Sequence, residues 1–440
     1  MTTHFKEKKY LSAKGLLEKV RSCFDNIEEP PRDSRGLKNK IPLTDCLMSG
    51  LAIFGLKFPS LLQFDQAAEG EVIKHNLKTL YGIDRVPSDT YMRERLDFID
   101  PDSLRAAFSD VFFCLQRGKV LEDYKFLDQY LLIPCDGTGL FSSKEIYCNN
   151  CCQKHHKDGS ISYYHQMLAG VIVHPDYKEV LPFCPEPISK PDGSSKNDCE
   201  QNAFKRFLDY FYREHPRLKP IFTYDALIAT APPLRFIKEK SGHFIVGVKP
   251  EGNASLFEWL KGVDLATHHV KTKKETLEFR FFNKIPLNDS NHDFEVNFFE
   301  CTIRDAKGKK TGFFSWITDI LITKENITEL SRGARARWKI ENETFNTLKN
   351  QGYNFEHNYG HGNKHLCHVF GTLMFLAFLI DQIQQRCCGL FQAALKKMKT
   401  KTRLWKRFYS VFTELLVPTW EDFFLWMIDN SGKVLLPNSS

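Results

Sequence analysis

Apolar and polar residues follow two different periods along this chain, and the period changes at identifiable positions. In residues 42–128 apolar residues recur every three or four positions, as in LMSGLAIFGL and EVIKHNLKTLYG, which predicts helices. Residues 1–37 are polar and end in EEPPRDSRG, a composition typical of a tail or linker. We therefore predict a tail or linker at residues 1–37 and a helical domain at residues 38–127.

Two of the predicted helices form a hairpin that bears on function. The helix EVIKHNLKTLYG stops at Gly82, and SDTYMRERLDFI begins at the capping candidates Ser88 and Asp89. This order is similar to a helix-turn-helix, whose second helix would bring Arg93 and Arg95 to DNA. An ordinary helical hairpin gives the same pattern and is the alternative.

The pattern in the middle of the chain predicts strands that form a sheet. Strand-like stretches at 130–134, 163–174 and 179–183 precede an amphipathic helix at 198–214, and a further apolar strand follows at 221–224. Strands, a helix and another strand in this order predict an α/β fold with a mixed sheet and flanking helices. We assign residues 128–243 to the first part of this core.

Residues 244–323 alternate with period two and are interrupted by the turns NDSNHD and DAKGKKTG, which predicts an all-β insertion. The next stretch, LSRGARARWKIENETFNTLKNQG, predicts a helix that ends at Gly352. We assign residues 324–395 to the second part of the core and residues 396–440 to a basic and aromatic C-terminal segment.

Composition narrows the class of protein. A chain of 440 residues with 42% hydrophobic and 13% aromatic residues is typical of a globular protein with more than one domain. The stretch MTTHFKEKKYLSAKG has no signal-peptide core, and the longest apolar run, 366–380, is short for a membrane span and includes His368 and Gly371. We therefore expect that run to be a buried helix, and the protein to be cytoplasmic (nucleoid-associated in a bacterium) and not bound to a membrane.

The net charge of +7 is modest, but the basic residues are grouped. Eight basic residues and no acid lie between Arg386 and Arg407, and a second group comprises Arg332, Arg335, Arg337 and Lys339. Such groups, with tryptophans among them, favour a nucleic-acid backbone as partner because each neutralised phosphate releases counterions. A solvated helix face is the alternative.

Thirteen cysteines in a chain with no secretion signal argue against a disulfide framework. The segment CNNCCQKHH, residues 148–156, combines a C-x₂-C pair with two histidines, and we predict a loop with structural Zn²⁺ held by Cys148, Cys151, His155 and His156. Reduced cysteines beside surface histidines are the alternative. The stretch HNYGHGNKHLCH is also rich in histidine, but we interpret it as a glycine-rich turn that enters a buried helix.

Three acids are candidates for catalysis. Asp136 and Asp225 follow the apolar runs LLIPC and IFTY, and Glu341 lies within a predicted helix. Carboxylates brought together from such positions suit two hard divalent cations, which activate a nucleophile and stabilise the leaving oxygen at a phosphodiester. Each acid also has a structural explanation: Asp136 as a turn residue, Asp225 as a helix cap, and Glu341 as the partner of Arg337 one turn earlier.

Taken together, IPCDGTG, FTYDAL and RWKIEN make the chain resemble the DDE transposases of bacterial insertion sequences, over roughly residues 131–362. The resemblance implies a ribonuclease-H-like core, catalytic residues Asp136, Asp225 and Glu341, and two Mg²⁺ or Mn²⁺ ions held by those acids. The branch with a β-strand insertion before the glutamate fits, since 116 residues separate Asp225 from Glu341.

That branch often has a tyrosine, arginine, glutamate and lysine signature, and only part of it is present. Arg337 fits, whereas Ala334 stands at the tyrosine position and Leu348 at the lysine position, with Lys349 next to it. The resemblance implies DNA contacts by Arg337 and by Lys349 in place of the lysine, and the basic group described above adds Arg335 as a predicted DNA contact. Glu343 is a rival for Glu341, but it faces another direction on a helix.

The resemblance implies a transposase that cuts double-stranded DNA at transposon ends and joins the freed 3′-hydroxyl to target DNA, acting as a homodimer. Two alternatives are a catalytically inactive DNA-binding protein derived from a transposase and a metal-dependent nuclease of the same fold. Strand cleavage in Mg²⁺ against EDTA, and detection of joined products, would separate the three.

Overall fold

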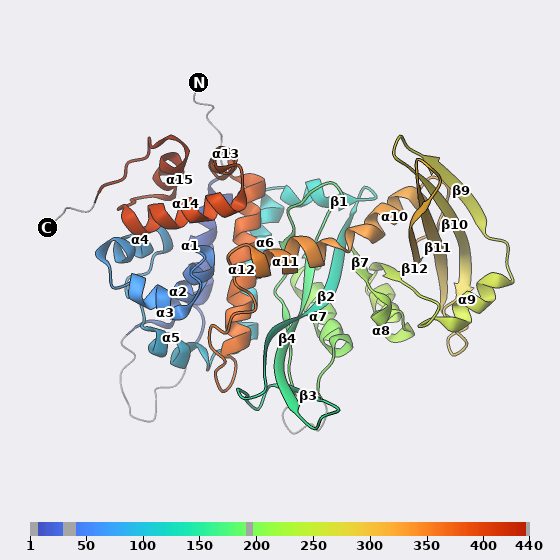
Figure 1. Cartoon of the computed structure of the whole chain (residues 1–440), viewed down its shortest axis with the longest axis horizontal. Helices are drawn as coiled ribbons and strands as arrows, with labels where there is room; N and C mark the ends of the chain where they lie inside the picture. Colours follow the sequence, from blue (N-terminus) through green and yellow to red (C-terminus); the bar gives the residue numbers. More distant parts are fainter. Residues whose placement is uncertain (1–7, 30–40, 191–196, 437–440) are drawn as a thin grey trace.

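The computed structural model describes residues 8–29, 41–190 and 197–436. Within these ranges the protein has a mixed α/β architecture, in which one large sheet extends from a body of helices to a projecting end made of β9–β12 (Figure 1). The predicted mixed α/β class is therefore confirmed.

The sheet has twelve strands in the described residues, and nine of them follow the order β3-β4-β2-β7-β8-β12-β11-β10-β9. Strands β2, β7 and β8 pair in parallel, and the other pairs are antiparallel. The strand bounds are β1 Lys125–Phe126, β2 Tyr130–Ser143, β3 Cys152–His155, β4 Ile161–Ile172, β5 Leu181–Pro182, β6 Glu186–Ile188, β7 Pro220–Tyr224, β8 His243–Gly247, β9 Ala266–Lys271, β10 Glu275–Pro286, β11 Glu295–Asp305 and β12 Lys310–Thr318.

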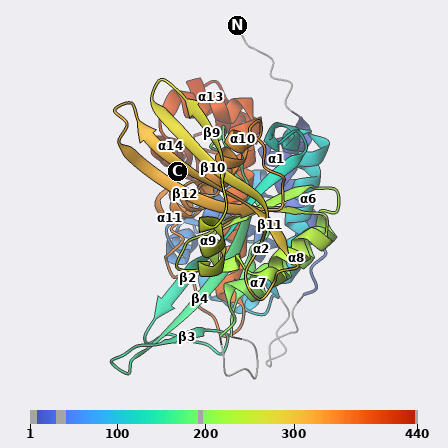
Figure 2. The same ribbon diagram turned by 90° about the vertical axis from the view of Figure 1, so that its right-hand side faces the viewer.

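The segment between Asp225 and Glu341 extends this sheet. Strand β12 pairs antiparallel with β8, so β9–β12 continue the central sheet and form the projecting end that faces the viewer in Figure 2. Contrary to the all-β prediction, the segment also contains helix α9 (Ala254–Lys261), whose buried Leu256 and Leu260 are one turn apart.

The helical body is built from both ends of the chain. Its helices are α1 Ala13–Phe24, α2 Leu43–Gly55, α3 Leu61–Ala67, α4 Glu71–Tyr81, α5 Asp89–Leu96, α6 Arg105–Arg117, α12 Leu366–Cys387, α13 Gly389–Met398, α14 Lys401–Glu414 and α15 Trp420–Asp429. The two ends are joined through Asn76 of α4, whose amide donates to the carbonyl oxygens of Phe412 and Leu415, each at 2.7 Å.

Helix α1 contradicts the prediction of a tail or linker for part of residues 1–37. Its Leu16, Leu17, Val20 and Phe24 recur at helical spacing and are all buried. The polar residues between them face outward, which explains why the stretch looked linker-like in sequence. Residues 1–7 and 30–37 of that prediction lie outside the described residues.

Helix α12 has the length and apolar composition of a membrane span, but it is enclosed by protein, as the sequence predicted. The carboxylate of Asp97, at the end of α5, accepts hydrogen bonds from the backbone N–H groups that precede and begin α12, at 2.9–3.1 Å. These donors belong to residues 363–366 and have no partner within the helix. The N-terminal helices therefore fix where α12 starts.

Helices cover both faces of the sheet. A Cβ at Gly371 of α12 would touch Leu140 and Met167, whereas a Cβ at Gly170 of β4 would meet the ring of Phe207. Phe207 belongs to α7 (Glu200–Glu214), which covers the opposite face together with α8 (Ala231–Glu239). Helix α10 (Ile327–Ala336) packs on β2 and β8. The helical segment that follows α10 contains part of the candidate site.

Candidate active site

Asp136 lies on β2, and Asp225 directly follows the neighbouring strand β7. Strand β2 pairs with β7 in parallel from Leu131↔Pro220 to Pro134↔Thr223, and the same register extended by two residues places Asp136 opposite Asp225. Neighbouring strands are about 4.8 Å apart. Contrary to the sequence prediction, Asp136 is not at a strand end, because β2 continues to Ser143 by pairing with β4.

Glu341 approaches Asp136 from a helical segment that contains an unusual turn. After α10 the chain continues as a π-helix, η5 (Ile340–Phe345), and then as α11 (Asn346–Asn350). Single π turns are rare and occur frequently at functional sites because they re-aim side chains. The buried Ile340 anchors the turn, which leaves Glu341 half-buried above β2.

Arg337 connects the helix to the strand. Its Nη2 donates to Glu341 Oε1 at 2.6 Å, and its Nη1 lies 3.4 Å from Asp136 Oδ2. The pairing of Glu341 with Arg337, proposed from sequence as a structural explanation, is therefore present, and it draws Glu341 toward Asp136. The rival Glu343 interacts electrostatically with Lys339 and Lys401 instead.

The second structural explanation is present as well. Asp225 is exposed, and its Oδ1 accepts a hydrogen bond from the backbone N–H of Leu227 at 2.9 Å, which caps a short 3₁₀ turn. Its other carboxylate oxygen has no hydrogen bond of this kind in the described structure. A capping role and a place beside Asp136 are thus compatible.

The neighbourhood of Asp136 disfavours negative charge. Burial raises the pKa of its carboxyl from 3.8 to about 6; the charge of Arg337 opposes this shift, and the charges of Glu200, Asp225 and Glu341 add to it. A buried acid surrounded by other acids is a common feature of catalytic sites. A divalent cation bound between these carboxylates would relieve the repulsion among them.

Glu200 is an acid of this site that is not among the residues predicted from the sequence, because it lies at the start of the predicted helix 198–214, where an acid is common. It is the first residue of α7, and its carboxylate covers Gly137, where an added Cβ would lie 2.3 Å from Oε1. Tyr224 donates to Glu200 Oε2 at 3.3 Å. Burial raises the pKa of Glu200, and the charge of Asp225 adds to this effect. The sequence signal was Gly137, which leaves room for this carboxylate.

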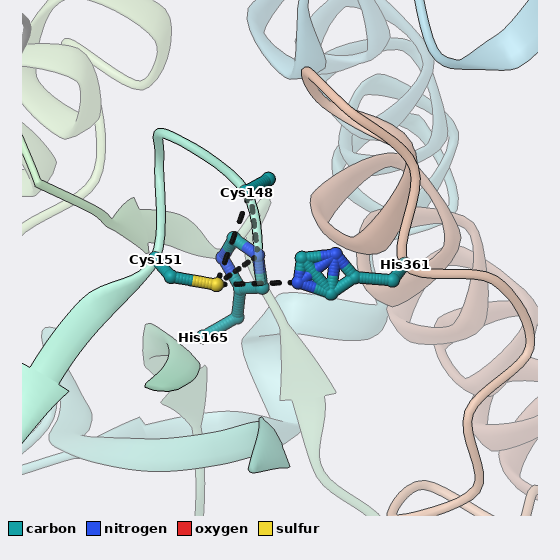
Figure 3. Close-up of side chains that lie close together, drawn as sticks. All are labelled: Cys148, Cys151, His165 and His361. Atoms are coloured by element: carbon teal, nitrogen blue, oxygen red, sulfur yellow. Dashed lines mark hydrogen bonds between the residues drawn. The ribbon is translucent and has the colours of Figure 1, made fainter. Parts of the chain in front are cut away.

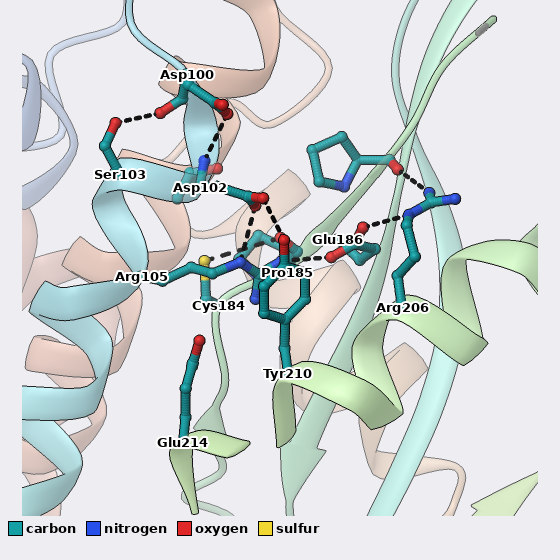
Figure 4. A network of polar contacts seen from close by, with 12 residues as sticks. Asp100, Asp102, Ser103, Arg105, Cys184, Pro185, Glu186, Arg206, Tyr210 and Glu214 are labelled. Carbon is teal, nitrogen blue, oxygen red and sulfur yellow. Dashed lines mark hydrogen bonds and ion pairs between the residues drawn. The ribbon is translucent and has the colours of Figure 1, made fainter. Parts of the chain in front are cut away.

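A partly buried ionic network fixes the helix that begins with Glu200 (Figure 4). Arg206 of α7 donates to Glu186 at 2.6 Å and to Asp198 at 2.7 Å, and Arg105 of α6 also pairs with Glu186. Tyr210 of α7 hydrogen-bonds Asp102, the second partner of Arg105. Because these contacts join α6, β6 and α7, the start of α7 is held in place against the sheet.

An open cleft of about 440 Å³ adjoins Asp225 and Arg337. It is lined by residues of β8, of the segment that follows β8 and of β12, among them Lys249, Phe313 and Phe314. Both phenylalanines are about 40% exposed, although phenylalanine is usually buried. Arg335 lies over the ring of Phe314 at 5.7 Å from its centroid. Exposed rings beside cations suit stacking of unpaired bases along a phosphate backbone.

The remaining residues predicted to contact DNA have other partners in this structure. Arg95 is buried and paired with Glu29, which contradicts its predicted role as a surface DNA contact. Arg93 is partly exposed but ion-paired with Asp89 one turn earlier. Lys349 pairs with Glu356 at 2.8 Å. Of the predicted residues, Arg335 and Arg337 lie beside the cleft.

The predicted cysteine ligands do come together, but with different histidines (Figure 3). The sulfurs of Cys148 and Cys151 lie against His165 of β4 and against His361, which follows α11. His155, the last residue of β3, and His156, which follows it, were the predicted ligands but are not part of this cluster. His156 instead contacts the hydroxyl of Ser162 at 2.7 Å.

Comparisons with known proteins assign no family. No protein-family model matches the chain, and no curated protein matches it. Among solved structures, the fold is similar to that of a piggyBac transposase in a synaptic complex with hairpin DNA, determined by cryo-EM, with 10% identity over 98% of this chain and 84% of that chain and a TM-score of 0.42. We therefore base the function on the residues of this chain.

Proposed function

We propose that this protein is a DDE-type transposase, with a ribonuclease-H-like core, that cleaves DNA at transposon ends and transfers the freed 3′-hydroxyl to target DNA. The observation that supports the proposal is the convergence of three acids distant in sequence: Asp225 directly follows β7, the parallel neighbour of the strand that carries Asp136, and Arg337 links Glu341 to Asp136.

The donor set fits hard divalent cations. Asp136, Asp225 and Glu341 offer only carboxylate oxygens, which suit Mg²⁺ or Mn²⁺. Burial and three neighbouring acids raise the pKa of Asp136 although Arg337 opposes the shift, so additional positive charge would be favourable there. When bound, two such ions would activate the attacking oxygen and stabilise the leaving one. Arg337 already pairs with two of these acids, so we expect its guanidinium to move toward a phosphate when cations bind.

The other residues of the chain position the substrate. Lys249 and Arg337 at the cleft would neutralise backbone phosphates, and Phe313 and Phe314 would stack on bases that are unpaired at a cut end. Positioning of this kind accounts for much of the catalysis of phosphoryl transfer, since no covalent enzyme intermediate is required. We further propose that two copies act together, one at each transposon end.

The test is a strand-cleavage assay on DNA that carries the sequences flanking the reading frame, in Mg²⁺ and in EDTA. Cleavage by the wild-type protein in Mg²⁺ only is expected, together with its loss in Asp136→Ala, Asp225→Ala and Glu341→Ala, each with retained DNA binding. Glu343→Ala, two residues from Glu341 on the same helix, is the matched control and should cleave normally.

The same assay separates the competing functions. Joined products indicate a transposase, whereas cleavage without joining indicates a metal-dependent nuclease. Binding with no cleavage by the wild type, in Mg²⁺ or Mn²⁺, would refute the enzymatic proposal and favour an inactive DNA-binding protein. Full cleavage by any of the three acid variants would refute the assignment of that acid.

A further inference from the structure

The cysteine–histidine cluster is independent of the carboxylate site and has the dimensions of a metal centre. Its four candidate ligand atoms, the sulfurs of Cys148 and Cys151 and one ring nitrogen each of His165 and His361, lie within 4.8 Å of one another. Cys148 is half-buried and the other three residues are buried. Figure 3 shows the four side chains pointing toward a common point.

The distances agree with tetrahedral coordination. With Zn–S bonds of about 2.3 Å and Zn–N bonds of about 2.0–2.1 Å, a regular tetrahedron separates two sulfurs by about 3.8 Å and a sulfur from a nitrogen by about 3.5 Å. The two sulfurs here are 3.9 Å apart. Nε2 of His165 lies 3.5 Å from each sulfur, and Nε2 of His361 lies 3.2 Å from Cys151 Sγ.

The orientation of His361 also fits a ligand. Its Nδ1 lies 3.2 Å from the carbonyl oxygen of Gly362, so this nitrogen carries the proton and donates, which leaves the lone pair of Nε2 directed at the cluster. Metal-bound histidines usually have such a partner on the second ring nitrogen. The segment that contains His361 is also held to the loop of Cys148 and Cys151, because Asn150 of that loop donates to the carbonyl oxygen of Lys364 at 2.7 Å.

We propose that Cys148, Cys151, His165 and His361 bind one structural Zn²⁺ ion that ties the β2–β3 loop and β4 to the segment between α11 and α12. Two thiolates and two imidazoles in a tetrahedron select zinc over Mg²⁺ or Ca²⁺. With four protein ligands the site is closed, so its role is structural and not catalytic.

The position of this ion explains what it would stabilise. His361 is 196 residues from His165, so the ion would close a very long loop between the sheet and the last helices. Strand β2 carries Asp136, and the segment of His361 follows the helical path of Glu341. A zinc ion here would therefore hold the two parts of the carboxylate site in one arrangement.

The test is metal analysis of the full-length protein purified in reductant without added metal. We expect about one zinc per chain in the wild type and less than a tenth of that in Cys151→Ser and His361→Gln. His155→Gln is the matched control, since it removes a nearby histidine outside the cluster, and it should retain the zinc. Glu341→Ala should also retain it, which separates this proposal from the catalytic one.

Because Cys151→Ser or His361→Gln could lose zinc simply by failing to fold, a second test uses a variant that keeps four ligands and a spectroscopic probe of the site. His361→Cys preserves a tetrahedral set of four ligands and should keep the zinc, and Co²⁺ in place of zinc should give the visible bands of tetrahedral cobalt with thiolate charge transfer. Absence of zinc from the folded, reduced wild type, with no cobalt spectrum on addition of Co²⁺, would overturn the proposal. So would full zinc retention in both Cys151→Ser and His361→Gln.

Discussion

Replacing Asp136 by asparagine should stabilise the protein while it abolishes the proposed cleavage. The pKa of Asp136 is raised in the folded protein, so the neutral carboxyl is favoured there and the ionised form is penalised. Its favourable contribution to folding is fully present below pH 3.8, the ordinary value, and is lost as the pH rises through about 6. Asparagine has nearly the same shape and is neutral at every pH.

The size of the effect follows from the shift. A rise from 3.8 to about 6 is about two pKa units, which corresponds to about 3 kcal/mol. The side chain is 22% exposed, so solvent screening reduces this amount somewhat. We expect Asp136→Asn to raise the free energy of unfolding by about 2 kcal/mol at pH 8 and by roughly half that amount at pH 5, where the folded carboxyl is largely protonated but the unfolded one is already ionised.

The assay is urea unfolding at pH 5 and pH 8 in EDTA, repeated at pH 8 in Mg²⁺. In EDTA the gain from Asp136→Asn should grow with pH, and in Mg²⁺ the wild type alone should recover stability, since asparagine is a poor ligand for that ion. Asp264→Asn, at an exposed position, serves as the control for loss of one charge and should change little. Glu200→Gln should move the pH dependence of the wild-type effect downward, because one repelling charge is removed.

Two results would refute this reasoning. A gain of the same size at pH 5 and pH 8 would mean that asparagine acts through packing and not through the charge of Asp136. Destabilisation at pH 8 would mean that the ion pair with Arg337 outweighs burial and the three neighbouring acids, contrary to the raised pKa.

Three further expectations concern stability and are measured by denaturant unfolding. Gly170→Ala should cost about 1–3 kcal/mol, because the new methyl group would lie 2.3 Å from a ring carbon of α7, whereas Gly139→Ala has open space and should cost almost nothing; similar losses would refute the packing. Asp97→Ala should cost about 2 kcal/mol by leaving the start of α12 uncapped, and an unchanged midpoint would contradict that role. Lys57→Met should cost about 3–5 kcal/mol by leaving Asp381 buried without its cation, and adding Asp381→Leu should restore most of the loss; additive losses would argue against the pair.

The structure confirms most of the elements expected from periodicity and corrects their limits. The helix before Gly82 and the helix after Ser88 are where the sequence placed them, because their caps and apolar stripes are local signals. The strand that carries Asp136 is longer than its apolar run, because β4 pairs with its polar second half. Pairing partners of that kind are not encoded in the strand's own residues.

The residues of the candidate site also fall into those that local sequence patterns indicate and those that only tertiary packing reveals. The sequence selected Asp136, Asp225 and Glu341 from short local patterns, and the fold brings Glu341 and Asp225 toward Asp136 on the central strand β2. Glu200 escaped selection because a glutamate at a helix start is ordinary in sequence, and only the packing of α7 over Gly137 brings it to the site. The burial of Arg95 against Glu29 was hidden for the same reason.

The sequence by itself determined the local elements, the mixed α/β class and the three acids, since helix and strand periods, caps and glycine turns act over a few residues. Only the tertiary structure decided that His165 and His361, rather than His155 and His156, complete the cluster of Cys148 and Cys151. The physical reason is that adjacent residues on a strand point to opposite faces, so nearness in sequence does not make ligands converge. The ligands converge because α12 packs against the sheet and brings together residues that are some two hundred positions apart in the chain.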